Sequence, residues 1–511
     1  MLAGRQRGYQ WSSSKRSLGV DLPAALNLIG ALLKYLSLAF LFPIGIALGY
    51  GESVWPFAIG GGVTFLSGAG LEFATRGKER VGPREGFLVV AATWLLGAVF
   101  MSLPYLLAEE PQFDAPIDAL FEAMSGMTTT GSSVLTDIPA LNHSLAMWRQ
   151  FSQWIGGMGI IVLAIAILPR LRVGGRQLFG SEAPGHEFQS LTSSIRETAR
   201  LMWVLYLGLT ALEVLLLSSI GWSGIDGEMN VFEALAHSFT TMPTGGFSTR
   251  ARSIEEFGAA TQWTIIVFMI LAGTNFVLLY GVVRRGMNPV RDEEFRAYVG
   301  ILGVASAVIF TSLLTADIST GEQALREAIF QAVTATTTTG YANADFALWT
   351  PLTAMIMLAL MFVGGMALST GGSVKVVRHL MLTKVFRREL DQTIHPEIVR
   401  PVRFNERSVD EKIVRGVGFF ILFYVALFVL GSIAITIDSA RAGVEATTFE
   451  AISASATTIG NVGPGFGFLG PMGSFEPFSD LSKAIMIVLM WMGRLELVPV
   501  AVLATRRYWR T

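Results

Sequence analysis

The sequence of 511 residues contains no cysteine and only five histidines. Without cysteine there can be no disulfide bond, no thiolate metal site and no cysteine nucleophile. None of the histidines stands in an HExxH motif or in another spacing typical of metal ligands. They are His143, His186, His237, His379 and His395. The sequence therefore gives little support to a metalloenzyme.

Charge is also scarce in this chain. Only 15% of the residues are charged and 52% are hydrophobic, whereas soluble proteins average about a quarter charged residues. Lysine plus arginine number 38 against 39 aspartates plus glutamates, so the chain has no basic excess of the kind that a nucleic-acid partner requires. We therefore expect an integral membrane protein that does not bind nucleic acid.

The motifs of an enzyme are missing as well. No Gly-x-x-x-x-Gly-Lys-Ser/Thr loop occurs, so a P-loop nucleotide site is excluded. The apolar stretches carry no constellation of nucleophile, base or metal ligands. No loop on the expected cytoplasmic side is long enough to hold a nucleotide-binding domain. We therefore do not expect an enzyme, and regulation by a nucleotide would have to come from another chain.

What the sequence has in abundance is long apolar stretches. Spanning a bilayer takes about 20 apolar residues, and ten stretches qualify. They cover roughly residues 23 to 50, 53 to 75, 86 to 108, 146 to 169, 198 to 221, 261 to 284, 297 to 316, 352 to 380, 409 to 437 and 481 to 507. The first stretch is too long for the apolar region of a signal peptide and is not followed by an Ala-x-Ala cleavage site. We therefore expect it to remain uncleaved, as the first membrane span.

Basic residues are distributed unevenly between the connections. With ten spans both termini lie on one side of the membrane, and the basic clusters all fall on that side. They are Arg5 to Arg16, Arg76 to Arg84, Arg170 to Arg176, Arg284 and Arg285, Arg378 to Arg388, and Arg506 to Arg510. The positive-inside rule identifies this side as the cytoplasm, so we expect both termini to be cytoplasmic.

Four connections on the outer side contain a short, weakly polar segment that ends in glycine. Such a segment is too short to span the membrane and too apolar for an ordinary loop, which is typical of a re-entrant half-helix. In every copy an acidic residue precedes a glycine by 13 positions. The copies run from Asp118 to Gly131, Glu233 to Gly246, Glu327 to Gly340, and Glu450 to Gly463. Gly460 is an alternative in the fourth copy, but it would break the common spacing.

These copies form an internal repeat that defines the expected fold. We predict an all-α integral membrane protein with ten transmembrane helices. An N-terminal two-helix hairpin precedes four pseudo-fourfold repeats, each made of a span, a pore helix, a filter segment and a second span. The expected units are the hairpin at residues 1 to 80 and the pore repeats at 81 to 172, 190 to 286, 292 to 382 and 405 to 511.

Such repeats favour the conduction of a cation. Irregular backbone lies at membrane depth only where it is buried in protein or lines a water-filled cavity. Glycine allows successive carbonyls to point the same way, and rings of carbonyl oxygens can replace the hydration shell of K⁺. The negative C-terminal ends of the half-helices favour the same ion. The acidic residue that begins each copy is interpreted as a first-turn partner of the helix dipole rather than as an ion ligand.

Two features are expected on the cytoplasmic side of this filter. The glycine-rich stretch at residues 364 to 373 should unwind the eighth span, with a kinked continuous helix as the alternative. Arg494 lies near the middle of the last apolar stretch, where an arginine is costly unless it faces a cavity or a partner. We favour a pore-facing position for Arg494 over snorkelling to an interface.

Specific motifs cover nearly all of the chain from about residue 20. They include TTTGSS at 128 to 133, WRQFSQWIGGMGIIVLAIAILP at 148 to 169, HSFTTMPTGGFSTR at 237 to 250, AGTNF at 272 to 276, TTTTGYANADFALW at 336 to 349, GGMALSTGGSVKVVR at 364 to 378, IHPEIVRPVRFNERSV at 394 to 409, NVGPGFG at 461 to 467 and MGRLEL at 492 to 497. With these motifs the sequence resembles the Trk/Ktr/HKT superfamily of potassium transporters. The extra N-terminal hairpin is similar to the TrkH-like branch, the membrane subunits of bacterial Trk systems, rather than to the shorter KtrB branch.

The resemblance implies which residues form a potassium filter and its gate. The filter residues would be Thr129, Thr130, Gly131, Thr244, Gly245, Gly246, Thr338, Thr339, Gly340, Asn461, Val462 and Gly463. Some plant relatives that prefer sodium have serine at the first-repeat glycine, so Gly131 implies potassium. The gate beneath the filter would be formed by Gly364, Gly365, Ser369, Thr370, Gly371, Gly372 and Arg494.

The resemblance also implies location and partners. Family members form a homodimer in the bacterial inner membrane and dock onto a cytoplasmic ring of TrkA-like subunits that bind NAD(H) or ATP-type ligands. K⁺ would be the transported ion, and no cofactor is expected on this chain. The basic segments around Arg170 to Arg176 and Arg378 to Arg388 are candidate docking surfaces, although the positive-inside rule would make them basic in any case.

Other transport mechanisms remain as alternatives. An ion-coupled carrier for an organic solute would need inverted repeats with broken helices at the midplane, whereas these repeats are parallel and all open on the outer side. A secondary transporter of another cation, which carries Na⁺ or couples K⁺ to H⁺, is the alternative function.

Overall fold

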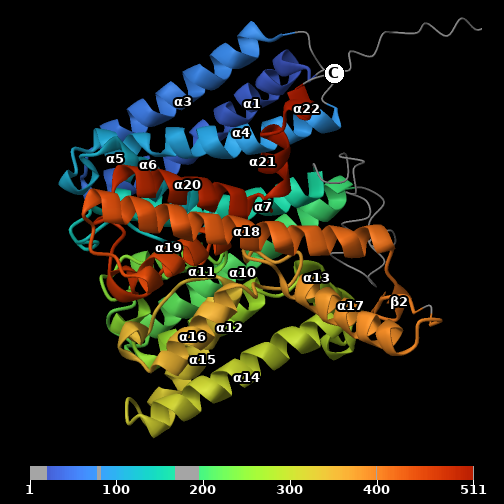
Figure 1. Cartoon of the computed structure of the whole chain (residues 1–511). Helices are drawn as coiled ribbons and strands as arrows, with labels where there is room; N and C mark the ends of the chain where they lie inside the picture. Colours follow the sequence, from blue (N-terminus) through green and yellow to red (C-terminus); the bar gives the residue numbers. More distant parts are fainter. Residues whose placement is uncertain (1–19, 77–81, 167–194, 399, 510–511) are drawn as a thin grey trace, which may run out of the picture.

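The computed structural model describes residues 20 to 76, 82 to 166, 195 to 398 and 400 to 509. Within these ranges the chain is mostly helical, with one two-stranded antiparallel sheet. Most long helices run side by side across the molecule (Figure 1). The basic cluster from Arg170 to Arg176, and the ends of the expected units that fall between residues 167 and 194, lie outside the described residues.

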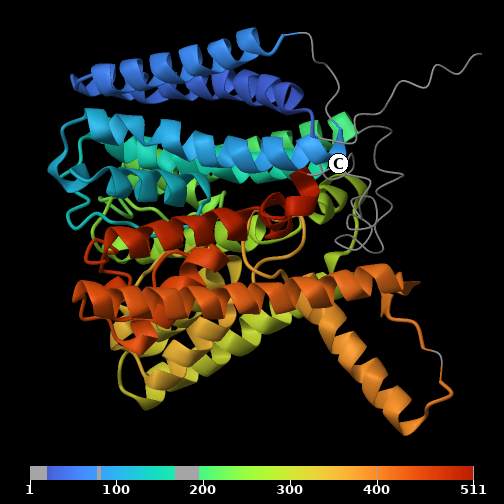
Figure 2. The same cartoon turned by 45° about the horizontal axis from the view of Figure 1, so that its top comes forward.

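A helical hairpin forms one side of the bundle (Figure 2). Its helices are α1 (Leu22–Ser37), η1 (Leu38–Phe40), α2 (Leu41–Tyr50) and α3 (Trp55–Ala74). Gly30 of α1 and Gly68 of α3 let the two backbones approach closely. A Cβ atom on either glycine would lie 2.6 Å from the carbonyl oxygen of the other. Small residues at such crossings are typical of helix pairs in membranes.

After this hairpin one order of elements recurs four times: a long helix, a short helix, an irregular segment and a further helix. The first set has α4 (Pro83–Met101), α5 (Leu103–Leu107), η2 (Pro111–Phe113), α6 (Pro116–Met127) and α7 (His143–Ala166). The second set has α10 (Ile195–Trp222), α11 (Val231–Thr241), η3 (Ser253–Glu256), α12 (Ala259–Ala272), α13 (Phe276–Arg285) and η4 (Pro289–Arg291).

The third and fourth sets follow the same order. The third has α14 (Glu293–Thr315), α15 (Gly321–Thr337), η5 (Phe346–Leu348), α16 (Pro351–Met361) and α17 (Val376–Ile394). The two strands of the sheet follow it, β1 (Arg403–Phe404) and β2 (Arg407–Ser408). The fourth set has α18 (Glu411–Ala442), α19 (Thr448–Gly460), η6 (Gly467–Leu469), α20 (Asp480–Arg494), α21 (Val498–Leu503) and α22 (Arg506–Trp509).

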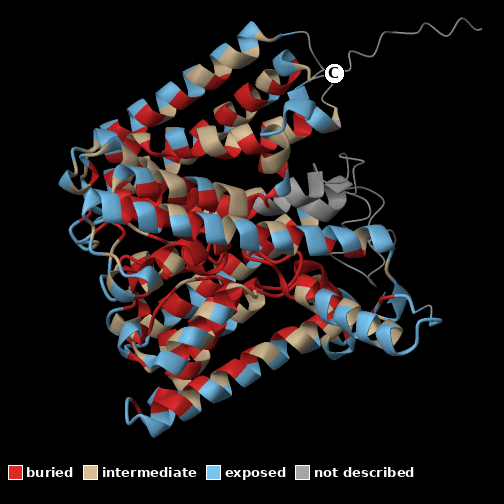
Figure 3. Cartoon of the chain, in the orientation of Figure 1, coloured by how far each residue is buried: buried red, intermediate tan, exposed pale blue. Residues whose placement is uncertain are grey.

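Six helices of the described part are long and apolar enough to cross a membrane, or seven if the bent pair α12 and α13 counts as one span. The outward faces of the bundle carry large apolar side chains, among them Leu48, Leu422 and Leu430. Buried residues gather at the centre, around the irregular segments (Figure 3). An apolar exterior around a packed interior defines a multi-pass membrane protein.

Two apolar stretches that were expected to be single spans are broken. The sixth, at 261 to 284, bends by 99° between α12 and α13. Asn275 caps the second part, because its side chain accepts from the backbone amides of Val277 and Leu278. The last stretch, at 481 to 507, ends its first helix at Arg494, and Glu496 and Leu497 take left-handed backbone conformations before α21 begins.

Both ends of the described chain lie at the same end of the bundle. The backbone amide of Asp21 donates to Glu85 Oε1 at 2.8 Å, and the Tyr508 hydroxyl donates to the carbonyl oxygen of Arg84 at 2.7 Å. Both contacts fall on the first turn of α4. The described part of the chain therefore begins and ends close to Arg84, which belongs to one of the basic clusters of the sequence.

Candidate functional site: a ring of four glycine segments

The four short helices α6, α11, α15 and α19 end in the same backbone geometry. One to three positions beyond the end of each helix lies a residue with φ between 53° and 61°, a value that is uncommon outside glycine. These residues are Thr129, Thr244, Thr338 and Asn461. The next backbone amide then donates to the carbonyl five residues earlier, at 2.8 Å for Thr130, 2.8 Å for Gly245, 2.9 Å for Thr339 and 2.9 Å for Val462. This is the hydrogen bond of the Schellman motif.

The glycine that follows closes the four segments into a ring. Gly131, Gly246, Gly340 and Gly463 have φ values of 85°, 74°, 81° and 114°. An added Cβ would lie 2.2 Å from Gly245 O for Gly131, 2.0 Å from Thr339 O for Gly246, 2.0 Å from Val462 O for Gly340, and 2.9 Å from Thr130 O for Gly463. Each oxygen belongs to the residue just before the glycine of another segment. The first segment thus meets the second, the second the third, the third the fourth, and the fourth the first.

Gly460 and Gly463 take different positions in this arrangement. Gly460 is the last residue of α19, and its carbonyl oxygen lies 2.4 Å from where a Cβ on Gly372 would be. Gly463 has the positive φ and the ring contact that the other three glycines share. The spacing of 13 residues therefore selects the glycines that are equivalent in backbone geometry.

The acidic residues at the start of the four copies lie far from the ring. Asp118 is in the first turn of α6 and pairs with Lys483 at 2.5 Å. Glu233 lies in the first turn of α11, and Glu450 forms a capping box with Thr447. The first-turn prediction was wrong for Glu327, because α15 begins earlier, at Gly321, and its first turn contains Glu322 instead.

Buried polar side chains hold the ring from outside, and the sequence interpretation missed them. Gln153 of α7 donates to Gly245 O at 2.7 Å and accepts from the Phe247 amide at 3.1 Å. The Tyr341 hydroxyl donates to His237 O at 3.0 Å. The sequence does contain a clue to Gln153 and to Arg149, one turn earlier. Both are polar residues inside an apolar stretch, where polar side chains are rare unless they have a role.

An irregular segment at residues 362 to 375 lies directly against one side of the ring. It separates α16 from α17, so the predicted interruption is present and the continuous helix is wrong. The Thr370 hydroxyl donates to Met242 O at 2.9 Å, and the Gly372 amide donates to Thr338 Oγ1 at 2.7 Å. A Cβ on Gly371 would lie 2.9 Å from Thr337 O. The segment therefore contacts the C-terminal ends of α11 and α15.

Arg494 joins this segment to the rest of the bundle. Only 3% of the residue is exposed, so the snorkelling alternative is wrong. Its Nη1 donates to Thr370 O at 2.9 Å, and its Nη2 lies 3.5 Å from Gly156 O. Arg494 ends α20, and Glu496, two residues later, pairs with Arg378 at 2.7 Å. A permanent positive charge thus lies beside the irregular segment at the centre of the molecule.

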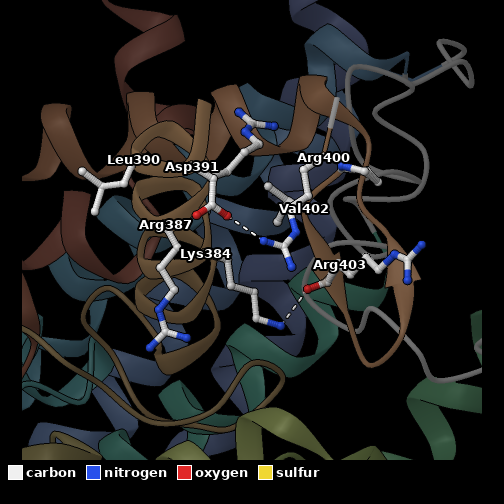
Figure 4. A pocket seen from close by; sticks show the side chains of 9 residues that line it. Lys384, Arg387, Leu390, Asp391, Arg400, Val402 and Arg403 are labelled. Carbon is white, nitrogen blue, oxygen red and sulfur yellow. Dashed lines mark hydrogen bonds and ion pairs between the residues drawn. The ribbon is translucent and has the colours of Figure 1, made fainter. Parts of the chain in front are cut away.

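The basic segment at Arg378 to Arg388 continues away from the bundle along α17. Part of it lines a cavity of about 760 Å³ between α17 and the chain leading into β1 (Figure 4). The lining residues are Lys384, Arg387, Arg388, Leu390, Asp391, Arg400, Pro401, Val402 and Arg403. Five of these nine side chains are cationic and one is acidic, so the cavity is positively charged.

Long apolar helices around a closed ring of backbone carbonyls define a class, that of multi-pass membrane proteins built to transport small ions. The chain belongs to the TrkH family, whose model is described as a cation transport protein and matches residues 55 to 510. This is a family of transporters and not of enzymes.

Two relatives and a solved structure are similar to this chain over nearly all of its length. The Trk system potassium uptake protein TrkH of Halomonas elongata is 37% identical over 96% of this chain and 100% of that protein. The TrkH protein of Vibrio parahaemolyticus is 36% identical over 95% of this chain and 99% of that protein. The crystal structure of the potassium transporter TrkH from Vibrio parahaemolyticus matches with a TM-score of 0.84 at 32% identity, covering 96% of this chain and 100% of that one.

Proposed function

We propose that this chain takes up K⁺ through a single pore that its four repeats form together, across ten membrane spans. The observation that carries the proposal is the ring of Gly131, Gly246, Gly340 and Gly463, in which each glycine has a positive φ and meets a carbonyl of another segment. The relatives' printed names, which describe potassium uptake, support the choice of ion.

The ring gives a physical route to binding a dehydrated cation. The carbonyl oxygens of residues 129 to 131, 244 to 246, 338 to 340 and 461 to 463 replace the hydration shell of K⁺. The C-terminal ends of α6, α11, α15 and α19 carry about half a negative charge each and point toward the ring. The membrane potential drives uptake with about 2.3 kcal/mol per charge for every 100 mV.

The irregular segment and Arg494 form the gate in this proposal. Residues 364 to 373 occupy the path on one side of the ring, where the Gly372 amide is bound to Thr338. The charge of Arg494 adds an electrostatic barrier to cations beside them. Opening requires this segment to move away, which its four glycines and its lack of helix facilitate.

Control of the gate comes from outside the chain. We place the basic end of the bundle in the cytoplasm of a bacterial inner membrane, with both termini there. A homodimer of this chain binds TrkA-like subunits that carry NAD(H) or an ATP-type ligand, and the cationic cavity beside α17 is the docking surface.

Growth rescue tests the function. A bacterium that lacks its own potassium uptake is supplied with this chain and a TrkA-like partner, and is grown at low external K⁺ with Na⁺ as competitor. Growth that depends on the chain and withstands Na⁺ supports the proposal. Failure with well-expressed protein, or rescue that follows Na⁺ or a proton gradient instead, favours the secondary transporter of another cation.

A further inference from the structure

One position in the short helices anchors the segment that follows the ring. It lies nine residues before the ring glycine, and the four copies hold Glu122, His237, Gln331 and Ala454. His237 Nε2 is 2.9 Å from Ser248 Oγ, and Gln331 Nε2 donates to Asn343 Oδ1 at 3.1 Å. The first three copies therefore have a polar side chain at this position that holds their own segment, whereas the fourth has alanine there and uses the preceding Ser453, which accepts from the Phe466 amide at 3.1 Å.

The first copy differs from the others because its anchor is charged. Glu122 pairs with Arg149 of α7, with Nη2 2.7 Å from Oε1, and neither side chain has exposed surface. Glu122 also accepts from the Ser133 hydroxyl at 3.0 Å and from the Val134 amide at 3.1 Å. Arg149 Nε donates to Oε1 as well, at 2.8 Å. These four contacts leave the carboxylate hydrogen-bonded on both oxygens, which a buried ion pair needs in order not to be destabilising.

Arg149 also contacts the second segment. Its Nη1 donates to Ser248 O at 3.2 Å, and its guanidinium lies 4.2 Å from the centre of the Phe247 ring. Ser133 and Ser248 each lie two residues after their ring glycine. One ion pair therefore holds equivalent points of two neighbouring segments, and the planar fork of an arginine is what reaches both.

We propose that Glu122 and Arg149 are positioning residues that set the discrimination between K⁺ and Na⁺ by fixing the first segment against the second. This inference rests on the proposed function of the ring. A ring whose segments can shift inward accommodates the smaller Na⁺, so selectivity by cavity size requires that neighbouring segments be held apart. The ion pair supplies that restraint at the one junction where it occurs among the described residues.

The test measures the reversal potential of the full chain together with a TrkA-like partner and its nucleotide in proteoliposomes, with K⁺ on one side and Na⁺ on the other. Arg149→Lys keeps the charge but cannot reach Glu122 and Ser248 together, and Ser133→Ala removes the hydroxyl between Glu122 and the first segment. We expect the K⁺ to Na⁺ permeability ratio to fall several-fold in both variants. Lys483→Met is the matched control, because it breaks the ion pair with Asp118, one helical turn before Glu122 in α6.

The outcomes separate this inference from the proposed function. A wild-type chain without K⁺-selective conductance overturns the proposed function itself. A selective wild type with an unchanged ratio in Ser133→Ala and in folded Arg149→Lys overturns the role of the pair. An equal loss in Lys483→Met also overturns it, because any broken pair in α6 would then have the same effect. If Arg149→Lys does not fold, Ser133→Ala alone decides.

Discussion

The guanidinium of Arg494 donates a hydrogen bond to the carbonyl oxygen of Thr370 at 2.9 Å, which ties the end of α20 to the irregular segment between α16 and α17. Thr370 in turn donates to Met242 O, one residue beyond the end of α11. The charge of Arg494 and the segment that borders the ring are thus parts of one contact network. In the proposed pore, the Arg494 side chain and the irregular segment must both move before K⁺ can pass.

Replacing Arg494 with glutamine removes the charge and leaves a side chain that can still bond to Thr370 O. We expect basal K⁺ flux to rise in proteoliposomes without a regulatory subunit. A barrier lowered by about 1.4 kcal/mol corresponds to a tenfold higher flux. Arg494→Lys retains the charge and should stay close to the wild type, whereas a flux in Arg494→Gln that equals the wild type would rule out an electrostatic barrier.

The bond between Gly372 and Thr338 offers a test of the segment itself. Thr338→Val removes the hydroxyl that accepts the Gly372 amide and keeps the branched shape of the side chain. We expect the basal flux to increase because the segment loses one restraint, worth about 1 kcal/mol. Thr338→Ser retains the hydroxyl and serves as the control. Equal flux in the two variants would show that this bond does not hold the gate closed.

Substitution of a ring glycine should impair ion selectivity. Gly131→Ser places a Cβ 2.2 Å from Gly245 O at a φ of 85°, so the two segments must move apart. We expect lower discrimination of K⁺ over Na⁺ in uptake competition, with expression close to normal. Gly300 has open space around its Cα, and Gly300→Ser should transport like the wild type. Unchanged selectivity in Gly131→Ser would show that the ring is not the filter.

The cationic cavity predicts where a regulatory partner binds. Arg387 and Arg403 line it, and neither side chain has an ion pair within the described part of the chain. The double variant Arg387→Gln with Arg403→Gln should weaken co-purification with a TrkA-like subunit about tenfold or more, since charge-assisted contacts contribute about 1.5 to 3 kcal/mol each.

The double variant Arg285→Gln with Arg415→Gln is its control. It removes the same charge from the same end of the molecule, outside the cavity. A similar loss of partner binding in both double variants would indicate a general effect of charge and contradict docking at the cavity.

Much of the ring follows from sequence because its determinants are local. A residue in left-handed conformation and a glycine two positions later recur at one spacing, so the 13-residue register locates all four ring glycines. The unwinding at 364 to 373 is also local, since it follows from four glycines and three hydroxyl side chains. The TrkH family assignment rests on motifs of the same kind.

The contacts between repeats join residues that are far apart in the chain, so they could not be predicted from the sequence. Glu122 and Arg149 are 27 positions apart, and the serine carbonyl that completes their site is 99 positions beyond Arg149. The break after Arg494 has no glycine or proline at Glu496 and Leu497, the residues that adopt positive φ. Tertiary packing imposes it, because Glu496 pairs with Arg378 on a different helix.

Diffraction from crystals grown with Rb⁺ in place of K⁺ tests the central claim most directly. Rb⁺ scatters anomalously, so its position is seen independently of the protein. The proposed filter predicts anomalous density on the axis of the ring, coordinated by carbonyl oxygens of the segments that end in Gly131, Gly246, Gly340 and Gly463. Density elsewhere, with none at the ring, would contradict the claim that these four segments bind the transported ion.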